Sequence, residues 1–260
     1  MKLTVYHVDA FSDRLFGGNP AAVVVTKEPL DDTLMQSVAA ENNLSETAFV
    51  HTDGEAYRIR WFTPTVEVDL CGHATLAAAH VCFVHLAYAP GRITFDSRSG
   101  LLHVRKSGGL LWLDLPADTI ESVPSDPLVT EALGLKPLEL YRGRDDYMAL
   151  FADETGVASL KPDMARLAQL PARGIIVTSH GSQSDFVSRF FAPQSGIPED
   201  PVTGSAHTTL APYWSKRLHR EELTARQLSA RGGELICRSL GERVEIGGKA
   251  VTYMVGELLL

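Results

Sequence analysis

Two short stretches of the sequence place chemically active side chains at the start of a helix pattern rich in small residues. They are DLCGHATLAAAH, which begins at Asp69, and GIPEDPVTGSAHTTLAPYW, which ends at Trp214. The first N–H groups of a helix lack partners within it, and the positive end of the helix dipole lies there. Each start could therefore hold a carboxylate or an oxyanion. The residues at the two starts are Cys71, Gly72 and His73, and Thr203, Gly204 and Ser205.

His73 and Ser205 occupy the same place in the two stretches, and both can hydrogen-bond a ligand held at a helix start. The alternative for His73 is a cap or a satisfied core histidine. Asp200 precedes Pro201, which favours an extended backbone and holds an acid near the second start. There Asp200 would accept N–H bonds or orient a catalytic group, unless it is a simple helix cap.

Glu46 and Cys71 are the candidates for proton transfer. Glu46, in NLSETAFV, enters an apolar run, and burial would raise its pKa towards the range useful for acid–base catalysis. The alternative is a solvent-exposed glutamate at a strand edge. A thiol at a helix start can act as a base, although a free cysteine is more often a small buried hydrophobe. The residue that aligns with Cys71 is Thr203, so a two-thiol racemase would lack one of its thiols.

The elements that would position these residues repeat along the chain. RWFTP, from Arg60, precedes the first helix start, and RFFAP, from Arg189, precedes the second, about half the chain later. A helix-like stretch and an apolar strand come before each, and strand patterns fill most of the remainder. We therefore predict an α+β fold with two similar domains, each a curved, mainly antiparallel sheet around a central helix.

The proline-rich, acidic stretch PADTIESVPSDPL, from Pro116 to Leu128, is the best candidate for a linker. We accordingly predict an N-terminal domain over residues 1–117 and a C-terminal domain over 118–260. This division allows the C-terminal strand to pair with the sheet of the first domain.

Composition excludes several classes of partner. The chain has 260 residues, is 45% hydrophobic and carries a net charge of −8 with interleaved signs, so we expect no nucleic-acid partner. Its apolar runs are too short to span a membrane, and no signal peptide is visible. The three cysteines have no CxxC spacing, which favours a reducing, cytoplasmic setting.

Metal and nucleotide sites receive no support from residue spacing. The nine histidines form no HExxH motif, and Cys71 and Cys82 do not have the spacing of zinc ligands. Neither GxGxxG nor GxxxxGK[ST] occurs. We therefore expect neither a metal nor a cofactor.

Five segments together resemble the PhzF-like family of phenazine-biosynthesis-type isomerases. They are FGGNPAAVVV, NLSETAFV, RWFTPTVEVDLCGHATLAAAHV, RFFAPQSGIPEDPVTGSAHTTLAPYW and GGKAVTYMVGEL. They are spread along the full chain and keep the family's order. The resemblance implies the diaminopimelate-epimerase fold, with the active site between two similar domains. Cys71 departs from the true phenazine enzymes, which leaves the specific substrate open.

By this resemblance, Glu46 matches the family's proton-shuttling glutamate, and His73, Asp200 and Ser205 match its other catalytic polar residues. Asn19 lies in a family motif near the cleft and joins the substrate-binding candidates, which are Asn19, Cys71, Gly72, Thr203 and Gly204. The family's known reaction isomerises trans-2,3-dihydro-3-hydroxyanthranilate without a cofactor, and the family also suggests a homodimer.

The resulting expectation is a cofactor-independent isomerase that moves a proton within a small carboxylate-bearing substrate. One alternative is a cysteine-dependent racemase or epimerase that uses Cys71 and a second base. The other is a non-catalytic binding protein on the same fold.

Overall fold

A computed structural model describes residues 1–52 and 56–260 of the chain. The chain forms two compact units, one made of residues 1–114 with 247–260 and the other of residues 115–246. The C-terminal strand lies in the first unit, where it pairs antiparallel with the first strand from Lys2–Leu259 to Ala10–Ala250. The boundary predicted from the sequence lies after residue 117, with this return of the C-terminal strand left open.

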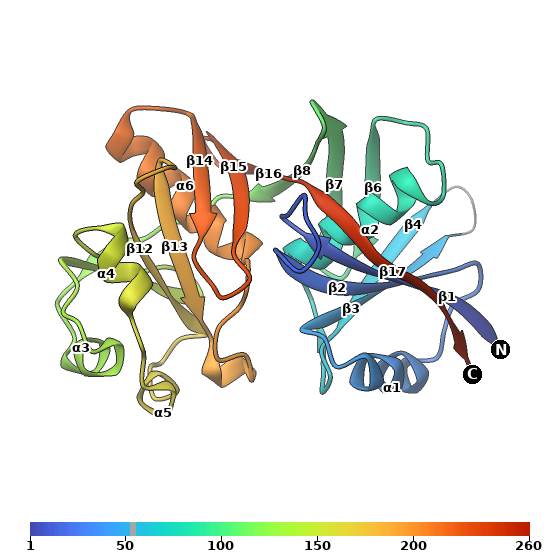
Figure 1. Cartoon of the computed structure of the whole chain (residues 1–260), viewed down its shortest axis with the longest axis horizontal. Helices are drawn as coiled ribbons and strands as arrows, with labels where there is room; N and C mark the ends of the chain where they lie inside the picture. Colours follow the sequence, from blue (N-terminus) through green and yellow to red (C-terminus); the bar gives the residue numbers. More distant parts are fainter. Residues whose placement is uncertain (53–55) are drawn as a thin grey trace. The chain divides into compact units, whose positions relative to one another are not determined.

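The first unit is a mixed sheet in which antiparallel pairings dominate (Figure 1). Its strands are β1 (Lys2–Ala10), β2 (Asn19–Thr26), β3 (Glu46–Thr52), β4 (Tyr57–Phe62), β5 (Glu67–Val68), β6 (Arg92–Ser97), β7 (Gly100–Ser107), most of β8 (Leu110–Pro116) and β17 (Ala250–Leu259), and its helices are α1 (Asp32–Asn42) and α2 (Gly72–Val84). The pairs β2–β3 and β4–β6 are parallel, and α1 and α2 lie in their crossover connections. Parallel neighbours need such long connections, whereas a hairpin can join antiparallel strands.

The second unit repeats this arrangement. Its elements are β9 (Glu121–Val123), α3 (Pro127–Leu133), β10 (Glu139–Arg142), β11 (Asp146–Leu150), α4 (Glu154–Ser159), α5 (Met164–Leu167), β12 (Gly174–His180), β13 (Phe186–Phe191), the 3₁₀ turn η1 (Pro193–Ser195), α6 (Gly204–Leu218), β14 (Glu222–Gln227), β15 (Gly233–Leu240) and most of β16 (Arg243–Gly248). Pairings from β1 to β7 run antiparallel, parallel, antiparallel, parallel, antiparallel, and those from β10 to β15 run the same way. The predicted α+β fold with two similar halves is confirmed.

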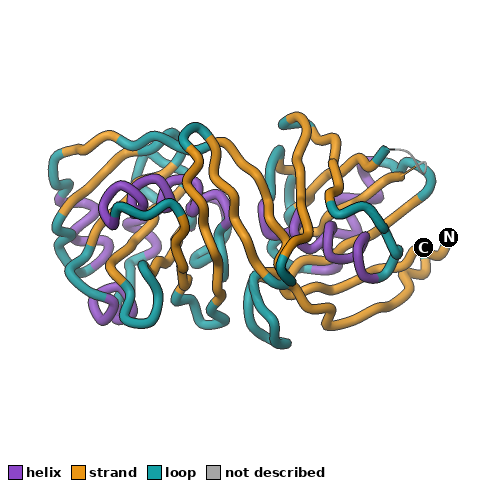
Figure 2. The backbone as a smooth tube through the Cα atoms, turned by 90° about the horizontal axis from the view of Figure 1, so that it is seen from above, coloured by secondary structure: helices purple, strands orange, loops and turns teal. Residues whose placement is uncertain are grey.

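The helices α2 and α6 are counterparts in this repeat, and each lies among the strands of its own unit (Figures 1 and 2). They begin at Gly72 and Gly204, where the sequence predicted helix starts. Almost every residue of α2 is buried, on all sides of the helix. A helix that is apolar all round belongs in a core, which explains why the small-residue pattern shows no polar face.

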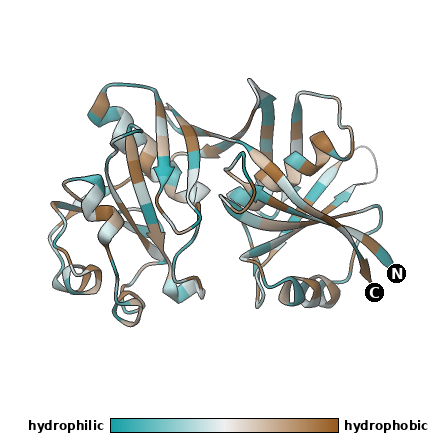
Figure 3. Ribbon diagram, in the orientation of Figure 1, coloured by the Kyte–Doolittle hydropathy of each residue, from teal (hydrophilic) through white to brown (hydrophobic). Residues whose placement is uncertain are grey.

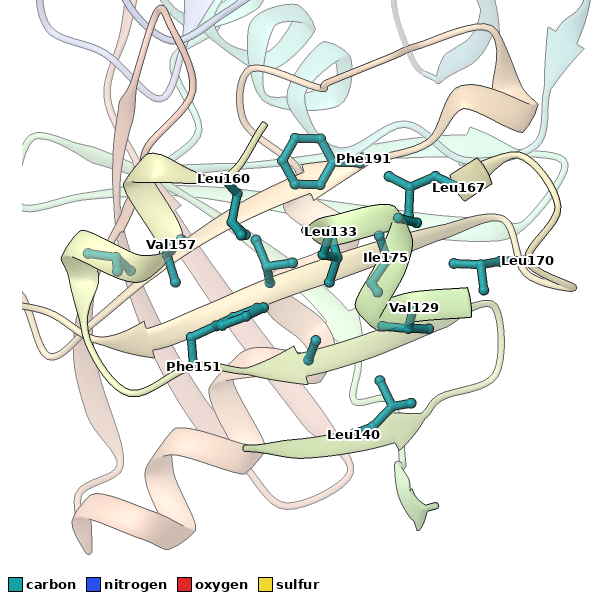
Figure 4. Close-up of a cluster of buried hydrophobic side chains, with 14 residues drawn as sticks. Val129, Leu133, Leu140, Phe151, Val157, Leu160, Leu167, Leu170, Ile175 and Phe191 are labelled. Atoms are coloured by element: carbon teal, nitrogen blue, oxygen red, sulfur yellow. The ribbon is translucent and has the colours of Figure 1, made fainter. Parts of the chain in front are cut away.

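Shorter helices cover the opposite face of each sheet. In the first unit α1 packs Met35, Val38 and Ala39 against Val24 and Phe49 of the sheet, and its mixed hydropathy is visible in Figure 3. In the second unit α3, α4 and α5 pack on the sheet through a cluster that includes Val129, Leu133, Val157, Leu167, Ile175 and Phe191 (Figure 4). Each sheet therefore has an α2- or α6-facing side and an outer, helix-covered side.

The predicted linker, residues 116–128, begins beside the boundary between the two units, but it is only partly a connection. Its strand β9 pairs with β10, and its Asp126 side chain accepts from Leu128 N–H to cap α3. Pro127 stands in the first turn of this helix, where its missing N–H costs nothing.

Candidate active site

Strand alternation directs Glu46 towards the helix α2. Phe49 of β3 packs with α1 on the outer side, and Thr47 accepts a hydrogen bond from Asn42 at the end of α1. Successive side chains of a strand point to opposite faces, so Glu46 and Ala48 point the other way. The same alternation on β2, where Ala22 and Val24 face α1, turns Asn19 to the α2 side.

His73, the second residue of α2, is the centre of a compact polar cluster. Its Nε2 lies 3.3 Å from Glu46 Oε2, within ion-pair distance but without the alignment of a hydrogen bond. Its Nδ1 lies 3.2 Å from Asn19 Nδ2 and 3.5 Å from Cys71 Sγ. Four residues predicted for the site thus meet around one imidazole, brought there by β2, β3 and the start of α2.

Burial keeps this imidazole neutral. His73 is 5% exposed, and burial lowers its pKa to about 3. A neutral ring has one donor and one acceptor nitrogen. The amide nitrogen of Asn19 can only donate, so Nδ1 accepts and the ring proton is on Nε2, facing Glu46. The ring proton therefore lies on the nitrogen nearer the Glu46 carboxylate, although the two groups are not aligned as a hydrogen bond.

Buried polar contacts in the second unit fix the turn that leads into α6. Thr203 Oγ1 donates to Asp200 Oδ2 at 2.6 Å, and neither side chain is exposed. Gln227 from β14 accepts from Thr203 N–H at 2.9 Å and donates to the Asp200 carbonyl at 2.7 Å. The side chains of Asp200 and Thr203 are thus tied together at the helix start, where both were predicted to lie, whereas Gln227 was not predicted.

Ser205, the second residue of α6, is held by an arginine. Arg173 Nη2 donates to Ser205 Oγ at 3.1 Å, while its Nε donates to Asp146 Oδ1 at 3.0 Å. Asp146 is buried, and the guanidinium lies 5.3 Å from the centre of the Phe190 ring. Burial alone would lower the pKa of Arg173, but the Asp146 carboxylate more than offsets this and raises it. Ser205 therefore accepts from a permanent cation, which leaves its own proton available for a ligand.

The internal repeat contains the signal by which Arg173 could have been found. The strand β12 is the counterpart of β3, and it begins at Gly174 as β3 begins at Glu46. Arg173 therefore stands beside the position that corresponds to the acid. At that position the second unit has glycine, and a Cβ added there would lie 2.7 Å from the Phe190 ring. The two units have similar backbones but different side chains at these positions. The first unit has the Glu46 carboxylate at the start of β3, and the second has the Arg173 guanidinium directly before β12.

The fold also assembles a metal-ligand set that spacing along the chain does not reveal. One donor atom from each of Glu46, Cys71 and His73 lies within 4.8 Å of the others. The sequence analysis expected no metal site because it compared only intervals between cysteines and histidines. A cavity of about 290 Å³ elsewhere in the first unit, lined by His80, Lys106 and others, includes none of the predicted site residues.

His207 gives the site region a measurable pH dependence. This residue of α6 is fully buried, its Nδ1 lies 2.8 Å from the Thr203 carbonyl, and burial lowers its pKa to about 4. The unfolded chain would bind a proton near pH 6.5, whereas the folded chain would not until about pH 4. The free energy of unfolding should therefore fall as the pH drops through this window, by about 1.4 kcal/mol per pH unit from this group.

We predict that His207→Asn flattens this dependence, because Asn can still donate to the Thr203 carbonyl but does not titrate. Urea unfolding at several pH values between 4 and 7.5 measures the slope. The difference in the free energy of unfolding between the wild type and His207→Asn at pH 7.5 measures the packing cost of the substitution separately. An unchanged slope in the variant would mean that His207 already takes up its proton in the folded state.

Comparisons with known proteins agree with this fold. A family model described as phenazine biosynthesis-like protein matches residues 8–256. An uncharacterized isomerase of Pseudomonas aeruginosa is 54% identical over 260 residues, covering all of both chains. A phenazine biosynthesis protein of the PhzF family from Enterococcus faecalis superposes with a TM-score of 0.97 at 48% identity, again covering all of both chains.

A more distant likeness concerns the fold alone. A hydroxyproline epimerase from Agrobacterium vitis superposes with a TM-score of 0.67 at 8% identity, covering 99% of this chain and 92% of that one. The two-unit architecture is therefore shared with epimerases.

Proposed function

Because the chain belongs to the family of phenazine biosynthesis-like proteins, we propose that it is an isomerase that moves a proton within a small carboxylate-bearing substrate and needs no cofactor. The observation that carries the proposal is the cluster of Glu46, His73 and Asn19 around the start of α2. It joins a carboxylate, a neutral imidazole 3.3 Å from it, and an amide that contacts the imidazole's other nitrogen. A partly buried carboxylate beside a neutral imidazole is the kind of group that serves as a general base.

In the proposed reaction Glu46 acts as base and then as acid. Its carboxylate removes a proton from one carbon of the substrate, and the electron pair of the broken C–H bond enters the substrate's conjugated system. Protonated Glu46 then returns the proton to another carbon on the same face, and a double bond has moved. In this proposal a small rotation of the side chains on substrate binding lets His73 Nε2–H, now 3.3 Å from Glu46 Oε2, donate to the charged carboxylate. No electron is gained or lost, so the step balances without a redox partner.

The second unit is proposed to hold the substrate's carboxylate. Ser205 would donate its hydroxyl proton to that group, with Arg173 behind it, and the first N–H groups of α6 would add their dipole. Asp200, tied to Thr203, would orient this start. Gly72 and Gly204 would let a ligand approach the backbone at the two helix starts.

The racemase alternative has one observation in its favour and one against. In its favour, Cys71 Sγ lies 3.5 Å from His73 Nδ1, so the imidazole could take the thiol's proton. Against it, the aligned residue is Thr203, whose hydroxyl donates to Asp200. An alcohol in that arrangement is a poor second base, so the glutamate shuttle is the better account. A non-catalytic binding protein would bind the same acids but would not incorporate deuterium into them.

Deuterium incorporation tests the proposed function. Protein treated with EDTA is incubated in D₂O with trans-2,3-dihydro-3-hydroxyanthranilate and a panel of small carboxylic acids, and the products are followed by NMR. We expect one compound to be isomerised with deuterium at the new C–H position, because the carboxyl proton of Glu46 exchanges with solvent. A reaction that proceeds only with an added nucleotide or metal ion would contradict the proposal.

Two further parts of the proposal concern the protein's setting. None of the helices among the described residues is long and apolar enough to cross a membrane. We propose a cytoplasmic location and a homodimer, the latter on the family resemblance. Sedimentation at micromolar concentration that showed only the 28.3 kDa chain would contradict the dimer.

A further inference from the structure

Three side chains of the first unit have the composition and spacing of a zinc site. Glu46, Cys71 and His73 offer a carboxylate, a thiol and an imidazole, with one donor atom of each within 4.8 Å of the others. These are the ligand types that bind zinc in proteins, and three protein ligands with an open fourth position are typical of accessible zinc sites. Cys71 and His73 are buried and Glu46 is partly buried, so the donors are held in place by their surroundings.

Part of the site already has the dimensions of a metal-bound one. Cys71 Sγ and His73 Nδ1 lie 3.5 Å apart. With a Zn–S bond of ~2.3 Å and a Zn–N bond of ~2.0 Å, a tetrahedral ion separates its sulfur and nitrogen ligands by about 3.5 Å. The Glu46 carboxylate, which lies within 4.8 Å of the other two donors, would have to move closer to them to complete the set.

The surroundings of His73 also suit a metal. Its Nδ1 lies within reach of both the Cys71 thiol and the Asn19 amide. The ion would replace the Asn19 amide nitrogen, now 3.2 Å away, as the partner of Nδ1. That exchange loses one neutral hydrogen bond and gains a metal–nitrogen bond.

We propose that Glu46, Cys71 and His73 bind a divalent cation of the zinc class, and that this ion inhibits the protein. Binding follows from the donor set alone. The inhibitory part rests on the proposed function, because the ion would occupy the carboxylate that must exchange a proton with the substrate. Zinc would then lower the fraction of active enzyme and take no part in the reaction.

Cobalt(II) is the probe for binding, because its spectrum identifies its ligands. EDTA-treated, dialysed protein is titrated with Co²⁺ under reducing conditions. We expect a thiolate-to-cobalt charge-transfer band in the near ultraviolet and intense visible bands of four-coordinate cobalt, saturating at one ion per chain. Adding Zn²⁺ should abolish both. Wild-type protein without a charge-transfer band would overturn the proposal.

Variants assign the ligands. Cys71→Ser should remove the charge-transfer band, and His73→Gln and Glu46→Gln should each weaken binding by at least about tenfold. The matched control is Cys82→Ala, which changes another buried thiol of the same helix. Burial raises the pKa of Cys82 to about 12, and Cys82 lies outside the three-residue cluster. A band that survives Cys71→Ser, or that disappears in Cys82→Ala, would place the ion elsewhere and refute the assignment.

A rate measurement separates the two parts. Micromolar Zn²⁺ should slow isomerisation in D₂O, and EDTA should restore it, in the wild type and in Cys82→Ala alike. In Cys71→Ser the same zinc concentration should have at most a tenth of this effect. Binding without inhibition would refute the inhibitory part and count against Glu46 as the acid–base group, whereas inhibition without a cobalt–thiolate band would refute the site itself.

Discussion

Replacing Glu46 by glutamine should lower turnover by about 10²–10⁴-fold, the usual cost of losing a general acid–base group. Glutamine has nearly the same shape and can still occupy the space beside His73 Nε2, but it cannot carry a proton between carbons. Initial rates of isomerisation in D₂O measure the effect. Binding of 3-hydroxyanthranilate, an aromatic analogue of the family's substrate, should change little in calorimetry, because the proposed carboxylate seat is built from Ser205 and helix N–H groups.

The matched comparison is Cys71→Ser, which should retain most activity. Cys71 lies at the same helix start and contacts the same imidazole at 3.5 Å, so a general disturbance of the cluster would affect both variants. Full turnover in Glu46→Gln together with an inactive Cys71→Ser would replace the glutamate shuttle with the thiol mechanism. Unfolding curves of both variants show whether a lost rate reflects a lost fold.

The fold could be predicted from the sequence because both halves contain the same motifs in the same order. Glycine followed by small apolar residues predicted both central helices, and these begin at Gly72 and Gly204. A helix surrounded on all sides must be apolar and narrow, and this requirement is visible in a short stretch of sequence. The linker prediction was only partly right, because the same residue types serve two purposes. Proline and acidic residues are common both in connections and at helix starts, and Asp126 and Pro127 are the cap and first turn of α3.

The site was predictable one side chain at a time, but its contacts were not. Glu46 and His73 stood out by type and position, and the structure brings them together. Arg173 did not, because an arginine before a strand has no local signal of function. Its role depends on Ser205, which lies 32 residues further along the chain. The same limit hid the ligand set of Glu46 and Cys71, which are on different elements. Spacing along a chain predicts metal sites only where the ligands share one element or loop.

Arg173→Lys is expected to give the second large effect, a fall of about 10–10² in kcat/KM. The guanidinium contacts Asp146 through Nε and Nη2 and Ser205 through Nη2. A lysine ammonium can remain beside the buried Asp146 carboxylate but lacks the planar fork needed to reach both. A hydrogen bond to a charged group contributes about 1.5–3 kcal/mol, and each 1.4 kcal/mol corresponds to a factor of ten in rate. Keeping the positive charge avoids leaving Asp146 as an unpaired buried carboxylate, which would destabilise the fold.

A double-mutant cycle shows whether Arg173 acts through Ser205. If the arginine only positions that hydroxyl, Arg173→Lys should have little further effect on kcat/KM once Ser205 is replaced by alanine. The matched control is Arg142→Lys, an exchange in the same unit whose guanidinium stacks 4.9 Å from the Tyr147 ring and donates to the Pro171 carbonyl. It should leave the rate unchanged. Additive losses from Arg173→Lys and Ser205→Ala would instead mean that the arginine contacts the substrate's carboxylate itself. Comparing 3-hydroxyanthranilate with 2-aminophenol, which lacks that carboxylate, would then show the loss of affinity for the acid alone.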